Sequence, residues 1–340
     1  MDELSLLHAM RAKTPVASDA AVEAGRMKLL QRIDPALVRA QPKPRRRTAM
    51  RLALASAATV AIVGGLIAGD ILAPAGGPGP GPAAATAAQV LNDAAQTTIQ
   101  TADPVVNPGQ YLKIDSTNLW GSFSTEQDGS QYQWLDTEKM TMYIPANRDD
   151  EWVWQRSGRI PTTFFDEASK EYVQRTQTGA KDEVLRGENG AFYGPGTESS
   201  FPSPNYLDAL PRDPHLLLED IYQKTVGKGQ SVDGEALVFI ADLLRTGVVR
   251  GEVRAALYKA AALIPGVTVT DEQATLDGRK GIAIGRVEDF SHFRQDIIID
   301  PQSGLPIGER QVLTEPLGTM PAGTATTWTT LETSVSDTAP

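Results

Sequence analysis

The side chains best suited to chemistry are few, and their spacing matches no common catalytic or metal-binding pattern. The chain has no cysteine and three histidines, His8, His215 and His292, so thiolate zinc sites are excluded. Its acidic clusters are runs of adjacent residues, Asp149-Asp150-Glu151 and Glu219-Asp220. Acid–base hydrolysis needs two carboxylates held apart across a cleft, which neighbours in a turn or on a helix surface do not supply. We therefore expect no catalytic residue, no metal site and no cofactor.

Nucleophile and phosphate-binding motifs give the same result. The loop GQSVDG at 229–234 misses the G-x-S-x-G nucleophile elbow by one position. The Gly-rich segment at 73–86 lacks G-x-x-x-x-G-K-[ST], and DEQATLDG at 271–278 does not match a calcium-binding loop. A non-enzymatic protein is predicted, with an exported hydrolase as the lower alternative.

One group of aromatic residues has a spacing that suggests a binding surface. Tyr132 and Trp134 alternate along one predicted strand, and Trp152 and Trp154 alternate along a neighbouring one. Alternate residues of a strand share a face of the sheet. Such a stripe can line a concave sheet that holds an apolar or lipid-like ligand. The alternative is that the four side chains fill a core beneath helices, and the sequence leaves both open.

The elements that would position this stripe predict an α+β domain over residues 87–340. A helix is expected at 87–100, strand patterns follow between 109 and 156, and a polar stretch at about 177–205 suggests a long loop. Helices return from about 213 to 263, and the remainder is rich in strand patterns, with a β-hairpin at 291–313. This order favours an antiparallel sheet, curved and half-barrel-like, packed on helices.

The region before this domain contains an apolar run that predicts a transmembrane helix at 52–72. A span needs about 20 mostly apolar residues, and the run is long enough to be retained, although a cleaved signal and a buried helix remain alternatives. Five basic residues precede it and no charge lies between Ala73 and Thr86, so the N-terminus is predicted to be cytoplasmic and the C-terminal domain extracytoplasmic. The five orienting residues are Lys43, Arg45, Arg46, Arg47 and Arg51.

Charge is distributed unevenly about this run. Residues 1–72 hold 11 basic and 6 acidic side chains, whereas the rest of the chain holds 21 basic and 36 acidic side chains. The acidic remainder argues against binding nucleic acid, whose phosphates it would repel.

Two further segments flank the predicted span. Residues 73–86 read as a Pro/Gly linker. Residues 1–47 form a cytoplasmic segment, in which 1–41 are either a flexible tail with helical tendency or a partner-binding helix pair.

Six segments spread along the chain carry a resemblance to known proteins: MDELSLLHAMRA, PKPRRRTAMRLALA, AAQVLNDAA, PGQYLKI, YLDALPRDPHLLLEDI and DIIIDPQSGLPIGERQVL. In these segments the chain resembles a family of actinobacterial single-pass membrane proteins associated with extracytoplasmic-function sigma factors. The resemblance implies an anti-sigma-like accessory protein of the cell membrane. It also implies an outer domain similar to the half-barrels of lipoprotein carriers and envelope-stress regulators, in which Asp300, Ser303, Gly304 and Pro306 fit a D-x-x-[ST]-G-x-P turn. The chain departs from zinc-type anti-sigma domains, which carry an H-x-x-x-C-x-x-C element, because it has no cysteine.

The leading hypothesis is a non-enzymatic, membrane-tethered binding or sensing accessory protein that regulates a sigma factor through residues 1–41. Its outer domain would engage a lipid or another component of the cell envelope. The alternative is an anchored carrier-like module for a lipid or another hydrophobic ligand, with no role in signalling.

Overall fold

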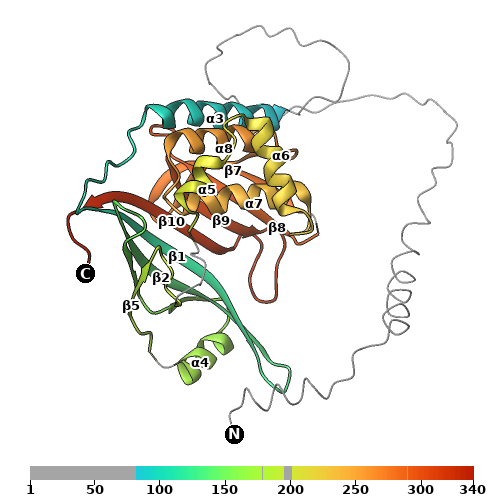
Figure 1. The fold of residues 1–340 in the computed structure, drawn as a ribbon. Coiled ribbons are helices and arrows are strands. Elements are labelled where there is room, and N and C mark those ends of the chain that lie inside the picture. Colours follow the sequence, from blue (N-terminus) through green and yellow to red (C-terminus); the bar gives the residue numbers. More distant parts are fainter. Residues whose placement is uncertain (1–81, 178, 195–200, 289) are drawn as a thin grey trace, which may run out of the picture. The chain divides into compact units, whose positions relative to one another are not determined.

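The computed structural model describes residues 82–177, 179–194, 201–288 and 290–340 (Figure 1). The chain divides into two units, Met1–Pro74 and Ala75–Pro340, and the described residues all belong to the second. The predicted cytoplasmic segment 1–47 and the predicted span 52–72 lie outside the described residues. Among the residues described, no helix is both long enough and apolar enough to cross a membrane.

A single antiparallel sheet forms the frame of the described part. Its strands follow the order β5-β3-β2-β1-β10-β9-β8-β7-β6, and β4 pairs with β2 beside this path. The β1–β2 hairpin is the longest pairing and extends beyond the helix layer toward α4, Glu167–Thr176 (Figure 1). The strand bounds are β1 Tyr111–Thr125, β2 Gln131–Pro145, β3 Glu151–Arg156, β4 Ile160–Phe164, β5 Glu183–Glu188, β6 Thr268–Leu276, β7 Arg279–Glu288, β8 Phe293–Ile299, β9 Pro306–Leu313 and β10 Ala325–Ser336.

Helices α3, α5, α6, α7 and α8 pack as a layer on one face of the sheet, and α4 lies apart at the far end of the β1–β2 hairpin (Figure 1). Side-chain caps begin several of them: Asp213 accepts hydrogen bonds from the backbone N–H groups of His215 and Leu216, and Ser231 accepts one from Gly234, which satisfies amides that a helix start leaves unpaired. The helix bounds are α3 Pro82–Gln100, α4 Glu167–Thr176, α5 Pro204–Ala209, α6 Pro214–Thr225, α7 Val232–Arg245 and α8 Gly251–Ala261.

The main core lies between the sheet and this helix layer. It includes Leu237 and Ile240 of α7 together with Ile284, Ile297 and Ile299 of the sheet, all almost fully buried. Alternation along the strands decides which residues enter the core. The opposite face carries smaller apolar clusters around Trp328. The α+β architecture with an antiparallel sheet packed on helices therefore agrees with the sequence prediction, whereas a half-barrel curvature stays a prediction.

Two predicted boundaries were wrong. The first helix begins at Pro82, inside the segment expected to be a linker, because proline is tolerated at the first helical turn, where an amide would be unpaired in any case. The stretch at 177–205 was expected to be a loop, yet Glu183–Glu188 forms the edge strand β5 against β3. An edge strand pairs on one side only, so its sequence carries a weak strand signal.

The predicted hairpin at 291–313 is confirmed as β8 and β9, and its turn has the geometry the sequence suggested. The Ser303 hydroxyl donates to Asp300 Oδ2 at 2.7 Å, and the Gly304 N–H donates to the Asp300 carbonyl at 2.8 Å. Gly304 has φ +65°, and a Cβ there would lie 2.5 Å from the Ala94 carbonyl oxygen of α3. Glycine is therefore required because the turn packs directly against that helix.

Candidate functional site

A cavity of about 740 Å³ opens between the sheet and the helix layer. Strands β1, β2 and β3 supply one wall, and α7, α5 and the segment around Phe201 supply the other. We call it the aromatic cavity. Small-molecule sites in proteins are typically pockets of about 300–1,000 Å³ lined mostly by apolar and aromatic groups, so this cavity has the volume of a binding site rather than of a packing defect.

Its apolar part follows from strand pairing. Ile114 of β1 pairs with Met142 of β2, and Met142 pairs with Trp154 of β3, so the three side chains stand side by side on one face. Phe239 of α7 and Tyr206 of α5 line the facing wall. Methionine and aromatic side chains fill irregular apolar space and adapt to what enters it. This wall suits a hydrocarbon or ring system.

Its polar part is organised by Glu138, a carboxylate that is only 2% exposed. Arg156 donates to Glu138 Oε1 from two nitrogens at 2.9 and 3.1 Å, and the Trp120 indole donates to Oε2 at 3.1 Å. Arg159 lies 3.5 Å from the same carboxylate. The two guanidinium groups also stack on aromatic rings. The Cζ atom of Arg156 lies 4.7 Å from the centroid of the Trp154 ring, and that of Arg159 lies 4.8 Å from the centroid of the Trp120 ring. The arginines are thus already held by an acid and by π faces.

A second acid on the same face extends this network. Asp136 is 4% exposed and accepts hydrogen bonds from the Trp134 indole at 2.9 Å and from the Ser122 hydroxyl. Both carboxylates of this pair are therefore occupied by donors, which is how buried charges are tolerated. The sequence prediction missed them. The signal was available, because positions 132, 134, 136 and 138 share one face of β2.

A third polar group joins α7 to β9 beside the cavity. Arg245, which lines the cavity, lies 3.0 Å from Asp242 Oδ1 and 3.3 Å from Glu309 Oε1. Burial raises the pKa of Glu309 to about 7, opposed by the positive charge of Arg245 and by a hydrogen bond from Gln295, and aided by the negative charge of Asp242. Burial also raises the pKa of Asp242, although Arg245 opposes the shift.

The four aromatic residues predicted to form a stripe do lie on one face, but they serve different regions. Only Trp154 lines the aromatic cavity. Tyr132 and Trp134 pack under α4, where Tyr132 stacks on Tyr172 with ring centroids 4.2 Å apart. Trp152 is 3% exposed and donates its indole N–H to the Arg148 carbonyl at 2.8 Å. Three of the four therefore contribute to the fold.

Other predicted sites lie elsewhere or outside the structure. The orienting residues Lys43, Arg45, Arg46, Arg47 and Arg51 fall outside the described residues. Asp149, Asp150 and Glu151 lie at the β2–β3 turn and are exposed. Within the described ranges, no three or more His, Asp or Glu side chains are placed to hold a metal ion.

No family model matches the chain, and the comparison with curated proteins found no match. Solved structures with a similar arrangement include MucB, at 11% identity and a TM-score of 0.27 over 77% of this chain and 61% of that chain. The complex of MucA and MucB from Pseudomonas aeruginosa gives 9% identity and a TM-score of 0.25 over 73% of this chain and 57% of that chain. A DUF1329 family protein from Desulfovibrio piger gives 8% identity and a TM-score of 0.20 over 74% of this chain and 92% of that chain. At these identities and TM-scores the likeness establishes no shared family or function.

Proposed function

We propose that residues 82–340 form a non-enzymatic binding domain for an amphiphilic ligand, most of which is apolar. The observation that carries this proposal is the aromatic cavity of about 740 Å³, which lies between the sheet and the helices and has methionine and aromatic side chains in its walls. Apolar space of this size favours hydrocarbon over water. A lipid is the ligand class that fits both the volume and the composition of the walls.

The charges around the cavity narrow the chemistry of the ligand. Glu138 neutralises Arg156 and Arg159 in part, Asp136 lies on the same face two residues away, and Arg245 is shared between two acids. A strongly anionic ligand would have to compete with these carboxylates for the arginines. The aromatic cavity therefore favours a neutral or zwitterionic amphiphile.

The experiment measures binding of the neutral fluorescent probe N-phenyl-1-naphthylamine to the purified full chain. Ser116 lines the cavity and is half-buried, so Ser116→Phe should fill the space and reduce affinity about tenfold or more, equivalent to about 1.4 kcal/mol. Trp154→Ala should change affinity because it removes a wall.

Phe290→Ala is the matched control, because Phe290 is 87% exposed and lies outside the cavity lining. It removes an aromatic side chain from the surface and should leave affinity unchanged. Binding that survives Ser116→Phe, or that is lost in Phe290→Ala, would refute the assignment to this cavity.

We propose further that residues 52–72 tether this domain to the cell membrane as a single span, with the basic flank in the cytoplasm. The support is the apolar run and its charge asymmetry. Because the chain has no cysteine, a single introduced cysteine reports its own side of the membrane. Ala40→Cys should be protected from an impermeant maleimide in intact cells, and Ser130→Cys should be labelled. The reverse pattern would contradict the topology.

We propose, in addition, a regulatory role for the N-terminal segment. Residues 1–41 carry an amphipathic pattern with Val22, Leu29 and Ile33 at helical spacing, which suits a cytoplasmic partner such as a sigma factor. Affinity capture with residues 1–47 and their Leu29→Asp variant tests this directly. Recovery of a sigma factor by the first and not by the second supports regulation, and no difference between them leaves the domain as an anchored carrier-like module.

A further inference from the structure

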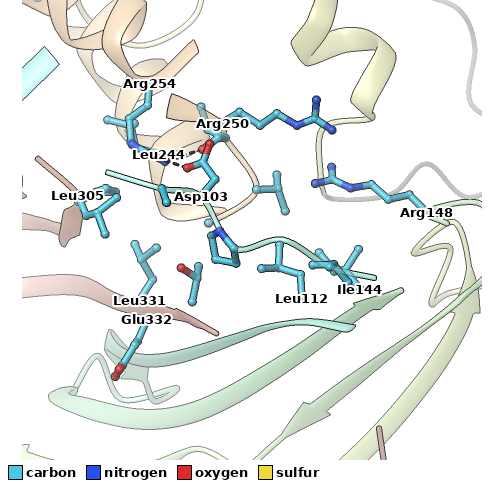
Figure 2. Close-up of a pocket in the computed structure, with 18 of the residues that line it drawn as sticks. Asp103, Leu112, Ile144, Arg148, Leu244, Arg250, Arg254, Leu305, Leu331 and Glu332 are labelled. Atoms are coloured by element: carbon cyan, nitrogen blue, oxygen red, sulfur yellow. Dashed lines mark hydrogen bonds and ion pairs between the residues drawn. The ribbon is translucent and has the colours of Figure 1, made fainter. Parts of the chain in front are cut away.

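A second cavity, of about 480 Å³, lies beside the aromatic cavity and is drawn in Figure 2. We call it the arginine cavity. Thr246 and Ile114 line the aromatic cavity, whereas Gly247 and Thr333 line the arginine cavity. A Cβ on Gly247 would lie 3.1 Å from Ile114 Cγ2 and 3.2 Å from Thr333 Cγ2, so the end of α7 rests on the sheet between the two spaces.

The walls of the arginine cavity are apolar where the sheet and α7 meet. Leu112 and Ile144 are a paired couple on β1 and β2, and Leu244 of α7 and Leu331 of β10 face the same space (Figure 2). All four are at least nine-tenths buried. The interior can therefore hold a hydrocarbon chain, as the aromatic cavity can.

Two of its arginines have clear structural partners. Arg254 donates to Asp103 Oδ1 at 2.9 Å and to the Val249 carbonyl at 2.8 Å, and it also contacts the Thr98 hydroxyl. Asp103 in turn accepts a hydrogen bond from the first amide of α8, Gly251, at 2.8 Å. Arg279 donates to the Leu331 carbonyl at 2.7 Å, next to the last residue pair that joins β10 to β9, Thr330 with Gly308. These groups hold the fold together.

The other two arginines, Arg148 and Arg250, make no side-chain hydrogen bond or ion pair with the described residues. Their guanidinium groups converge on one side of the cavity, away from the Arg254–Asp103 pair (Figure 2). The pKa of Arg148 is lowered by burial and by the positive charge of Arg250, with only a weaker opposing effect from Asp208 of α5. Two like charges thus approach one another without a carboxylate between them.

This arrangement is costly for folding alone. Like charges repel, and the half-buried Arg148 guanidinium loses hydration that no partner replaces, whereas Arg250 is exposed at the edge of the cavity and keeps its water. The chain after residue 72 has 36 acidic and 21 basic side chains, so acidic partners are plentiful elsewhere. Unpaired groups of this kind are expected where a ligand completes them.

We propose that the arginine cavity is a separate binding site for an amphiphile with an acidic head group of the phosphate or carboxylate type. Arg148 and Arg250 bind the acidic oxygens, and the apolar walls formed by Leu112, Ile144 and Leu244 receive the chain. Planar guanidinium groups match such oxygens in bidentate geometry. A free phosphate ion offers the same oxygens without a hydrocarbon chain. The apolar walls add affinity only for the amphiphile, so the two ligands can be told apart by binding measurements.

The test uses isothermal titration calorimetry on the full chain with dodecyl phosphate, dodecanol and inorganic phosphate as probes. Dodecyl phosphate is expected to bind about 100-fold more tightly than dodecanol, about tenfold for each charge-assisted contact, and Arg148→Gln combined with Arg250→Gln should remove this advantage. Higher ionic strength should weaken dodecyl phosphate and leave dodecanol unaffected. Lys228→Gln, an exposed charge at the α6–α7 turn, controls for net charge and should change nothing.

The outcomes separate the possibilities. If inorganic phosphate binds as tightly as dodecyl phosphate, the cavity binds a free anion. Arg148 and Arg250 then still bind the acidic oxygens, but the apolar walls do not bind a hydrocarbon chain. Equal affinities for dodecyl phosphate and dodecanol, or full affinity in the double variant, would overturn the proposal. Loss of dodecyl phosphate binding in Ser116→Phe would also overturn it, since that ligand would then lie in the aromatic cavity. Loss of N-phenyl-1-naphthylamine binding alone concerns only the aromatic cavity.

Discussion

The two cavities lie on the same face of one sheet, yet they treat charge in opposite ways. In the aromatic cavity, Arg156 and Arg159 share Glu138, and Arg245 is shared by Asp242 and Glu309. In the arginine cavity, Arg148 and Arg250 face one another with no carboxylate within ion-pair distance among the described residues. The same residue type is therefore a structural element in one cavity and a candidate ligand contact in the other.

The difference shows that pairing, rather than residue type or burial alone, separates arginines that stabilise a fold from arginines that await a ligand. A buried ion pair that loses one partner leaves an uncompensated charge. Replacing an arginine that has no partner breaks no interaction, so the free energy of unfolding should hardly change. Stability measurements can therefore break or sharpen the comparison before any ligand is identified.

The largest effect is expected for Glu138→Ala in the aromatic cavity. The substitution leaves Arg156, Arg159 and the Trp120 indole without their shared acceptor, so the free energy of unfolding should fall by about 3–5 kcal/mol. Urea unfolding measures it. Glu167→Ala, which breaks the exposed Lys170–Glu167 pair on α4, should cost at most about 1 kcal/mol. Similar losses in both variants would show that Glu138 does not organise the cavity.

A pH effect of similar size is expected from Glu309. Burial raises the pKa of Glu309 to about 7 from its ordinary value of 4.5, so the folded chain holds a proton that the unfolded chain releases between these two pH values. Stability contributed by this group is present below pH 4.5 and is lost as the pH rises toward 7, by about 3 kcal/mol in all. The free energy of unfolding of wild type and of Glu309→Gln, measured over this pH range, isolates the contribution of Glu309. Parallel profiles for the two proteins would contradict it.

A direct contrast within the arginine cavity comes next. Arg254→Met should cost about 2–3 kcal/mol, because it breaks the pair with Asp103 and removes a donor to Val249. Arg148→Met should lie within about 0.5 kcal/mol of wild type or be more stable, since it removes a repulsion. Thermal unfolding of the two variants and of wild type measures both changes in stability under the same conditions. Equal destabilisation would mean that Arg148 is structural as well.

The smallest effect concerns the contact that separates the cavities. Gly247 has φ +71° and lies against Ile114 and Thr333. Gly247→Ala should therefore cost about 1–2 kcal/mol from backbone strain and close contact. Gly109→Ala is a suitable comparison, because Gly109 has φ +87° with nothing within 4 Å of its Cβ position, and so reports strain alone. A loss no greater than that of Gly109→Ala would show that α7 does not press on the sheet at this point.

Sequence patterns were sufficient for the architecture because strand alternation and helix caps are local. The hairpin at 291–313 and the return of helices from about 213 were predicted from a few neighbouring residues. The edge strand β5 was missed because its pairing with β3 is a long-range contact that its own sequence hardly encodes.

The candidate site was predicted only in part, for the same reason. Alternation placed Tyr132, Trp134, Trp152 and Trp154 on one face, but which helix covers each of them depends on tertiary packing, and only Trp154 lines a cavity. Alternation would also have placed Asp136 and Glu138 on that face. The unpaired state of Arg148 and Arg250 has no sequence signal, because it depends on the absence of acids from distant segments.

The central claim is that a ligand enters the space between sheet and helices. Photo-crosslinking of the full chain with a neutral diazirine-bearing lipid, followed by peptide mapping, tests it most directly. The account predicts adducts on residues lining the aromatic cavity, such as Met140, Met142 and Phe239, and their loss in Ser116→Phe. Adducts confined to exposed side chains such as Phe123 and Phe290, unchanged in that variant, would contradict it.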